Sequence, residues 1–188
     1  MRAVLLTWNI RIRGKKMICG MTYYQICWYF LIYSFGGWAL EVVYHAVACG
    51  KVINRGFLNG PVCPVYGFGV LSVFAMMNTF QGSGYQLNDG MIFLFGVILA
   101  TAVELIAGWL LDVCFHARWW DYSNKKWNMD GYICLQYSVL WGILGVLALK
   151  FGNILGLTLL HLAPNGVMHI TLWILFCLLY TSPSPRDA

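Results

Sequence analysis

Two acidic residues interrupt apolar segments of this sequence, where ionisable side chains are least expected. Glu41 and Glu104 are both surrounded by aliphatic and aromatic residues. An ionisable group in a membrane helix costs several kcal/mol unless it is paired, protonated or close to the headgroups. Glu104, Gly108 and Asp112 also lie on one helical face, where the glycine lets another backbone approach. We therefore expect neither glutamate to face lipid.

A histidine follows an acid by four residues at two places, in the pairs Glu41/His45 and Asp112/His116. Residues four apart share a helix face, so each carboxylate and imidazole can reach a common partner. Three interpretations stay open: a hydrogen-bonded pair at a helix end, a proton or solute path, and a pair of metal ligands. The metal interpretation is the least favoured of the three, and no two cysteines have close zinc-ligand spacing, so our prediction contains no metal site and no cofactor. The candidate intramembrane polar pathway consists of Glu41, His45, Glu104, Asp112 and His116.

Apolar runs provide the helices that would position these residues. Hydrophobic residues make up 60% of the 188 positions and charged residues only 10%, too few to cover a water-exposed globule. A hydrocarbon core of about 30 Å requires about 20 helical residues. Runs that approach or exceed this length occupy residues 26–48, 64–80, 91–111 and 132–149, and a shorter fifth run starts near 167. The sequence predicts an all-α, multi-pass bundle of four to five transmembrane helices in the lipid bilayer.

The sequence also contains an internal repeat. With a shift of 71 residues, the segment Gly37–Ala46 lies over Gly108–Ala117, and over residues 37–67 nine positions are identical to their partners. A period that contains two spans predicts parallel helix–loop–helix repeats, with both connecting loops in one compartment. By analogy with transporters built from repeats, a substrate site is expected at the repeat interface.

The distribution of basic residues predicts the orientation. The connector 81–90 carries Asp89 and no base, whereas the repeat loops 50–60 and 118–131 carry Lys51, Arg55, Arg118, Lys125 and Lys126. The positive-inside rule therefore places the repeat loops in the cytoplasm. The basic arm 1–20 favours the opposite orientation if it is translated. Basic residues at helix flanks are typical of membrane proteins, and we expect no nucleic-acid binding.

Tryptophans near the ends of the apolar runs are typical of the headgroup level, and we interpret Trp38, Trp109, Trp119 and Trp120 as membrane-interface anchors. Phosphate-binding loops, nucleophile elbows and H-E-x-x-H pairs are missing from the sequence. We therefore expect no enzyme and no ATP hydrolysis by this chain alone.

Composition divides the chain into four parts. We expect a basic N-terminal arm (1–20, possible untranslated extension), a membrane domain (21–151) and a truncated further membrane segment (152–176). The membrane domain contains repeat one, about 26–80, and repeat two, about 91–150. The tail 177–188 is polar and rich in serine and proline, and it resembles a translated sequencing adapter.

Two stretches carry a resemblance to a known family. The sequences GWALE at 37–41 and NRGFLNGPVCPVYG at 54–67, extended through 104–142 with WDYS at 120–123, resemble the bacterial ABC-transporter type IV permease family, common in Firmicutes. The resemblance implies a permease-like subunit of the bacterial cell membrane, a separate ATP-hydrolysing subunit, and a homo- or hetero-oligomer around any pathway. The alternative is a membrane protein of structural, regulatory or envelope-related role without transport activity.

Overall fold

The computed structural model describes residues 17–54, 56, 60–116, 118–152, 170 and 173. The described part contains the helices α2 (Tyr23–Cys49), α3 (Pro64–Gly82), α4 (Asp89–Phe115) and α5 (Leu135–Leu147), which continues into the π-helix η3 (Ala148–Gly152). It also contains two short antiparallel hairpins, β1 (Met17–Ile18) with β2 (Met21–Thr22) and β3 (Asn128–Met129) with β4 (Ile133–Cys134). Residues 1–16 of the predicted arm, most of the segment 152–176 and the tail 177–188 lie outside the described residues.

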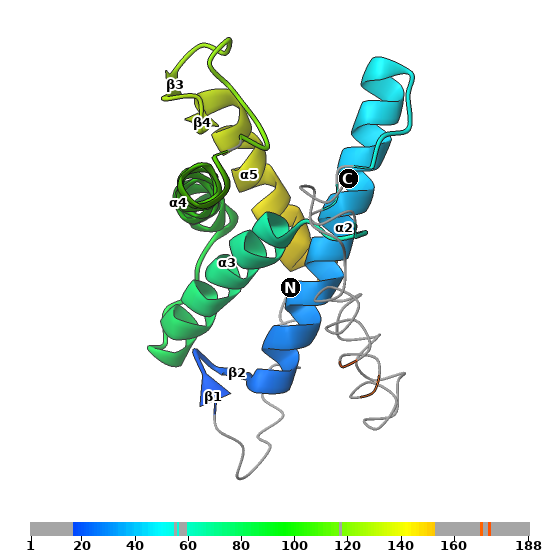
Figure 1. Cartoon of the computed structure of the whole chain (residues 1–188). Coiled ribbons are helices and arrows are strands. Elements are labelled where there is room, and N and C mark those ends of the chain that lie inside the picture. Colours follow the sequence, from blue (N-terminus) through cyan, green and yellow to red (C-terminus); the bar gives the residue numbers. More distant parts are fainter. Residues whose placement is uncertain are drawn as a thin grey trace.

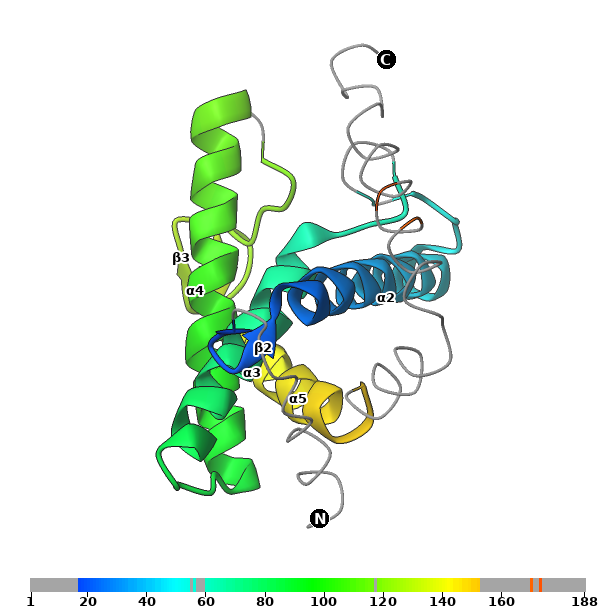
Figure 2. The ribbon, with the colours of Figure 1, turned by 90° about the horizontal axis from the view of Figure 1, so that it is seen from below.

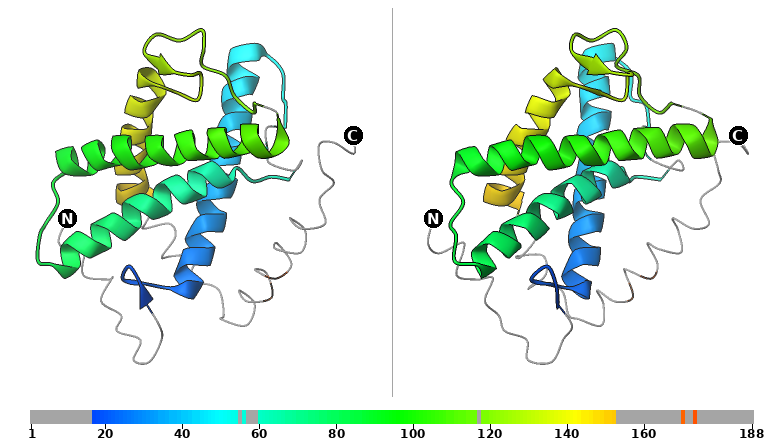
Figure 3. Two further views of the ribbon diagram at one scale, coloured as in Figure 1. Left: turned by 60° about the vertical axis from the view of Figure 1, so that its left-hand side comes forward. Right: turned by 90° about the vertical axis from the view of Figure 1, so that its left-hand side faces the viewer.

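The helices pack in a chain of neighbours. Helix α3 packs against both α2 and α4, and α5 packs against α4. The C-terminal end of α2 and the β3–β4 hairpin lie at one end of the structure, and the β1–β2 hairpin lies at the other (Figure 1). Helix α4 crosses α2 steeply instead of running alongside it (Figures 2 and 3).

Local sequence determines where the helices begin and end. Helix α2 starts with a capping box, in which Thr22 and Gln25 bond each other's backbone N–H groups, and it ends at Gly50 with a φ of 65°. Helix α3 starts with Pro64, whose missing N–H costs nothing at a first turn. The side chain of Asn88 caps α4 by accepting a hydrogen bond from the Met91 N–H.

Small residues allow the helices to approach closely. A Cβ atom at Gly67 would overlap Ser34 and Phe30 of α2, and one at Gly142 would lie 2.6 Å from Val97 Cγ2 of α4. Such contacts are typical of membrane helices, where backbone proximity replaces the hydrophobic effect as the source of packing energy. The buried core below them is formed by Met21, Tyr29, Val73, Phe74, Met77 and Leu149.

The mostly helical prediction is confirmed, and each of the four apolar runs contains a helix. Among the described residues, α2 and α4 are long and apolar enough to cross a membrane, while the apolar helix Leu135–Phe151 is shorter. The fourth predicted run, 132–149, was wrong at its start. Residues 132–134 form a turn and β4, because Asp130 and Gly131 both adopt positive φ and reverse the chain. Neither hairpin was predicted.

Candidate functional site

The buried acid Glu104 belongs to α4, and its side chain is contacted by α5 and by the loop before β3. Its side chain is 4% exposed. One carboxylate oxygen accepts a hydrogen bond from Trp141 Nε1 at 2.9 Å, and the other accepts one from the Tyr122 hydroxyl at 3.0 Å. Both donors are neutral. The prediction that this carboxyl group avoids lipid therefore agrees with its position.

Glu41 lies on α2 and is reached from α3. Its carboxylate accepts a hydrogen bond from the Tyr66 hydroxyl at 2.7 Å. A Cβ atom at Gly37, one turn earlier on α2, would overlap the Tyr66 ring, so the glycine is what lets this ring lie against the helix. The Tyr66 ring in turn packs on the Trp141 ring, with a centroid separation of 4.8 Å. Two aromatic rings therefore connect Glu41 to Glu104.

A second aromatic connection runs through the loop. Tyr122, the other donor to Glu104, stacks on Tyr137 of α5 with ring centroids 4.7 Å apart. Tyr137 interacts through its side chain with Tyr44, which lies one turn from Glu41 on α2. We call the set formed by two acids and their aromatic partners the polar centre: Glu41, Tyr66, Trp141, Glu104, Tyr122 and Tyr137. It is assembled from α2, α3, α4, α5 and one loop.

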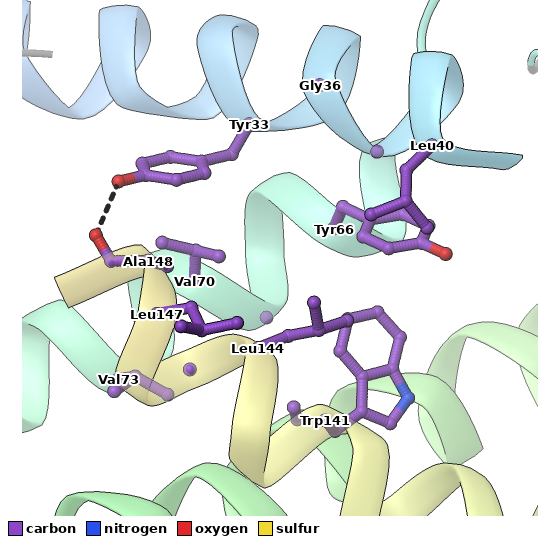
Figure 4. Close-up of a pocket in the computed structure, with 14 residues that line it drawn as sticks. Tyr33, Gly36, Leu40, Tyr66, Val70, Val73, Trp141, Leu144, Leu147 and Ala148 are labelled. Carbon is purple, nitrogen blue, oxygen red and sulfur yellow. Dashed lines mark hydrogen bonds between the residues drawn. The ribbon is translucent and has the colours of Figure 1, made fainter. Parts of the chain in front are cut away.

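A cavity of about 190 Å³ lies next to the polar centre. Figure 4 shows Tyr66 and Trp141 at one end of it and the Tyr33 hydroxyl at the other, where it donates to the Ala148 carbonyl at 3.2 Å. The walls between them are mainly apolar and include Leu40, Val70, Leu144 and Leu147. The cavity is therefore an apolar space with one end formed by the aromatic partners of the acids.

Asp112 lies apart from the polar centre, in a network at the end of α4. It accepts hydrogen bonds from the Tyr132 hydroxyl at 2.7 Å and from Arg118 Nε at 3.2 Å. The Arg118 guanidinium lies 4.7 Å from the Tyr132 ring centroid and donates to the Asp130 carbonyl at 3.0 Å. The hydrogen bond to Asp112 raises the pKa of Tyr132 above its usual value of 10.0, because it favours the protonated phenol.

The loop contains a further acid with a perturbed pKa. The Asp121 carboxylate accepts hydrogen bonds from the hydroxyl of Ser123, at 2.5 Å, and from its backbone N–H, at 2.9 Å. These bonds favour the ionised form and lower the pKa of Asp121 below its usual value of 3.8.

The two histidines do not occupy equivalent environments. His116 is exposed and ends α4 with a φ of 51°, and its backbone N–H donates to the Asp112 carbonyl at 2.8 Å. His45 is partly buried, with Nδ1 3.8 Å from the sulfur of Cys49. In the described part of the chain, no three His, Cys, Asp or Glu side chains cluster as metal ligands would.

The four predicted anchor tryptophans also differ in their contacts. Trp109 is 54% exposed on α4. Trp119 packs on the ring of Phe115 at the end of the same helix. Trp38 donates to Asn54 Oδ1 at 2.7 Å, and Trp120 donates to the Tyr132 carbonyl at 2.9 Å. Trp38 and Trp120 thus fasten the loops that follow α2 and α4, in addition to any contact with headgroups.

Sequence reasoning missed the residues that bind the acids. Tyr66 and Tyr137 are one of the nine identical pairs of the 71-residue shift, but nothing in their pattern predicts a carboxylate partner for Tyr66. Tyr122 belongs to the WDYS motif, which the family resemblance already singled out and which could have marked this residue as a candidate. Trp141 lies inside an apolar run, where an indole is expected to pack against other side chains rather than to donate a hydrogen bond to an acid.

Residues 28–182 match the family model described as "Putative ABC-transporter type IV", and the chain belongs to this family. The resemblance found in the sequence is thereby confirmed, and the matched range includes the first six residues of the tail 177–188. The family, together with the two apolar helices of spanning length among the described residues, points to a membrane location. No curated protein and no solved structure matches the chain significantly.

Proposed function

We propose that this chain is a permease-like membrane subunit of an ABC transporter and that the polar centre lines its pathway. The family membership supports a transporter component. The observation that carries the proposal is the placement of Glu41 and Glu104, on two different helices, within one aromatic hydrogen-bonded set beside a cavity. Acids that cost free energy in a membrane are typically retained there for ion or solute pathways.

The proposed pathway lies between the two predicted repeats. Helices α3 and α5 begin at Pro64 and Leu135, which are 71 residues apart, the same shift as in the sequence repeat. Glu41 and Tyr66 belong to the first repeat, and Glu104 and Trp141 belong to the second. This division supports a substrate path at the repeat interface, where repeat-built transporters bind their substrates.

The chemistry of the polar centre limits what would pass. Its members are two carboxyl groups, three phenols and one indole, and none of them is a base that would attract an anion. We therefore propose that the pathway carries either protons or a cationic solute. If it carries a solute, the apolar cavity walls would hold the apolar part of that molecule. His45, Asp112 and His116 lie towards the loop ends of α2 and α4 and form the proposed entrance of the path.

A structural role is the second candidate, and one observation favours it. Both oxygens of Glu104 accept hydrogen bonds from the protein, as a group that only joins helices would do. This candidate assigns the polar centre to the association of helices and requires no flux.

The first experiment is affinity purification of the tagged protein from a Gram-positive host in mild detergent, followed by mass spectrometry. We expect a stoichiometric ATP-hydrolysing subunit, because the chain carries no phosphate-binding motif of its own. Recovery of the chain alone, or only with copies of itself, would overturn the ABC assignment.

A second experiment separates the two candidate functions. In the purified complex, Glu104→Gln places an amide donor against Trp141 or Tyr122, and it removes a group that can bind a cation or exchange a proton. The transport proposal predicts at least a tenfold loss of vanadate-sensitive ATP hydrolysis with the complex still assembled. If only the melting temperature falls and hydrolysis is retained, the structural role is correct. Asp130→Asn, at an exposed loop position outside both the polar centre and the proposed entrance, is the matched control.

A further inference from the structure

A second cavity lies on the opposite side of α5 from the first and shares no residue with the polar centre. It is an open groove of about 540 Å³ between the loop before β3 and the first turns of α5. Its lining divides into a charged half and an apolar half, formed by Asn124, Lys125, Lys126 and Gln136 and by Trp127, Leu135 and Val139.

The charged half has two lysines with uncompensated charges. Lys125 and Lys126 are both exposed. The ion pairs in the described part of the chain are made by Arg118 and Lys150, and neither groove lysine takes part in them. Two adjacent ammonium groups therefore create a positive potential at the mouth of the groove, which attracts an anion.

The apolar half continues from the lysines along α5. Leu135 and Val139 are one turn apart on the same helix face, and they are 54% and 40% exposed. Trp127, at the junction of the two halves, is 82% exposed. In a membrane protein, an indole at the end of an apolar helix face is typical of the level between headgroups and acyl chains.

The backbone holds these groups in place. The Leu135 N–H donates to the Trp127 carbonyl at 3.1 Å, which joins the loop to the start of α5. Asn128 Nδ2 donates to the Lys125 carbonyl at 2.8 Å. Trp127 has a φ of 57°, a strained conformation for a bulky residue, and it nevertheless presents its ring to the outside. Backbone strain of this kind is concentrated at functional positions.

We propose that this groove binds an anionic phospholipid. The phosphate lies between the ammonium groups of Lys125 and Lys126, the indole of Trp127 lies at the level of the glycerol esters, and one acyl chain follows Leu135 and Val139. An anionic phospholipid supplies a negative charge and an aliphatic chain in the order that the groove presents them. The proposal rests on the membrane location and does not depend on transport activity.

The test measures lipid binding to the purified full chain by native mass spectrometry in mild detergent. Phosphatidylglycerol and phosphatidylcholine with identical acyl chains are titrated separately. We expect tighter binding of phosphatidylglycerol, and a loss of about fivefold in its affinity for each of Lys125→Gln and Lys126→Gln, since a basic residue at an anionic membrane contributes by about this factor. Phosphatidylcholine, whose choline cation balances its phosphate charge, should lose clearly less affinity in both variants, and Lys125→Arg should retain the preference.

Lys51→Gln is the matched control, because Lys51 is an exposed lysine of the other repeat loop. An equal loss in this variant would show diffuse attraction by net charge and overturn the site. Leu135→Gln should weaken phosphatidylglycerol binding while both lysines remain. If glycerol phosphate, which has no acyl chain, or an acidic peptide displaces the lipid at equal concentration, the groove is an anion or protein site and the proposal is wrong.

Discussion

A glycine, a tyrosine and an acid form the same arrangement on two helices, α2 and α4. In α2, the Tyr66 ring lies against Gly37 and its hydroxyl bonds Glu41 at 2.7 Å. In α4, the Tyr132 ring lies against Gly108 and its hydroxyl bonds Asp112, also at 2.7 Å. We call these the α2 unit and the α4 unit. In both, the acid follows the glycine by four residues, so a tyrosine lying along one helix turn reaches it.

The two units differ in where the tyrosine comes from. Tyr66 belongs to a helix, and its unit faces the polar centre, whereas Tyr132 belongs to a loop, and its unit faces Arg118. After the 71-residue shift, Tyr132 lies over Pro61, which has no hydroxyl to donate. The α2 unit therefore takes its tyrosine from α3. The position equivalent to Tyr66 is Tyr137, which instead stacks on Tyr122. The geometry at the acid is thus the same in both units, but the tyrosine that bonds the acid comes from positions that do not match after the shift.

Replacing each glycine by alanine should give the largest difference in stability loss between the α2 unit and the α4 unit. A Cβ atom at Gly37 overlaps the Tyr66 ring, which is enclosed between helices, so Gly37→Ala should cost about 1–3 kcal/mol of stability. At Gly108 the nearest atoms are Tyr132 Cδ1 at 3.1 Å and Trp120 Cζ2 at 3.2 Å, so these two rings need to move by only a few tenths of an ångström. The gain in helix propensity of about 1 kcal/mol should then leave Gly108→Ala nearly neutral. Thermal unfolding in detergent measures both, and equal losses would contradict the difference between the units.

Removing the tyrosine hydroxyls should have a smaller effect in the same direction. Tyr66→Phe deletes a hydrogen bond between membrane helices and should cost about 0.6–1.7 kcal/mol. Tyr132→Phe removes a bond at a partly exposed acid that Arg118 still pairs, so the melting temperature should fall less. A larger fall for Tyr132→Phe would show that the α4 unit, and not the α2 unit, holds the helices together.

Arg118 is the residue that distinguishes the α4 unit, because the 71-residue shift places it over Val47. Arg118→Val removes the ion pair with Asp112 and the hydrogen bond to the Asp130 carbonyl. We expect faster amide hydrogen exchange at Tyr122 and Tyr132, with unchanged exchange in α2. Arg118→Lys keeps the charge but not the two-pronged contact, so it should restore only part of the protection. No change in exchange would show that the loop is held by its tyrosines alone.

Low pH should destabilise the loop after α4, which contains Asp121, and leave the other repeat loop, 50–60, unchanged. Asp121, whose equivalent is Gly50, has a folded-state pKa lowered by Ser123, so its contribution to loop stability is present above pH 3.8 and is lost as the pH falls through the lower folded value. The amide resonance of Ser123, followed by NMR from pH 6 downwards, should titrate with a midpoint below 3.8. Ser123→Ala should move the midpoint of the neighbouring amide upwards, and a midpoint that stays in place would exclude the hydroxyl as the cause.

The sequence predicted the helices and the burial of Glu104 because both depend on the local density of apolar residues. It did not predict the partners of the acids, since Trp141 and Tyr66 are distant in sequence and hydropathy does not say which faces of two helices meet. The separation of Asp112 from the polar centre was equally hidden. Asp112 shares a helical face with Glu104, but α4 extends far enough to place it beside the loop.

The double attachment of the 118–134 loop has a practical consequence for studies of membrane topology. A reporter inserted there would break the link from Tyr122 to Glu104 or from Arg118 to Asp112, and the fusion would report on a damaged protein. Gly84, between α3 and α4, has a φ of 82° and open space around it. The connector at Gly84 is therefore the position at which this chain should accept an inserted reporter without change to its helices.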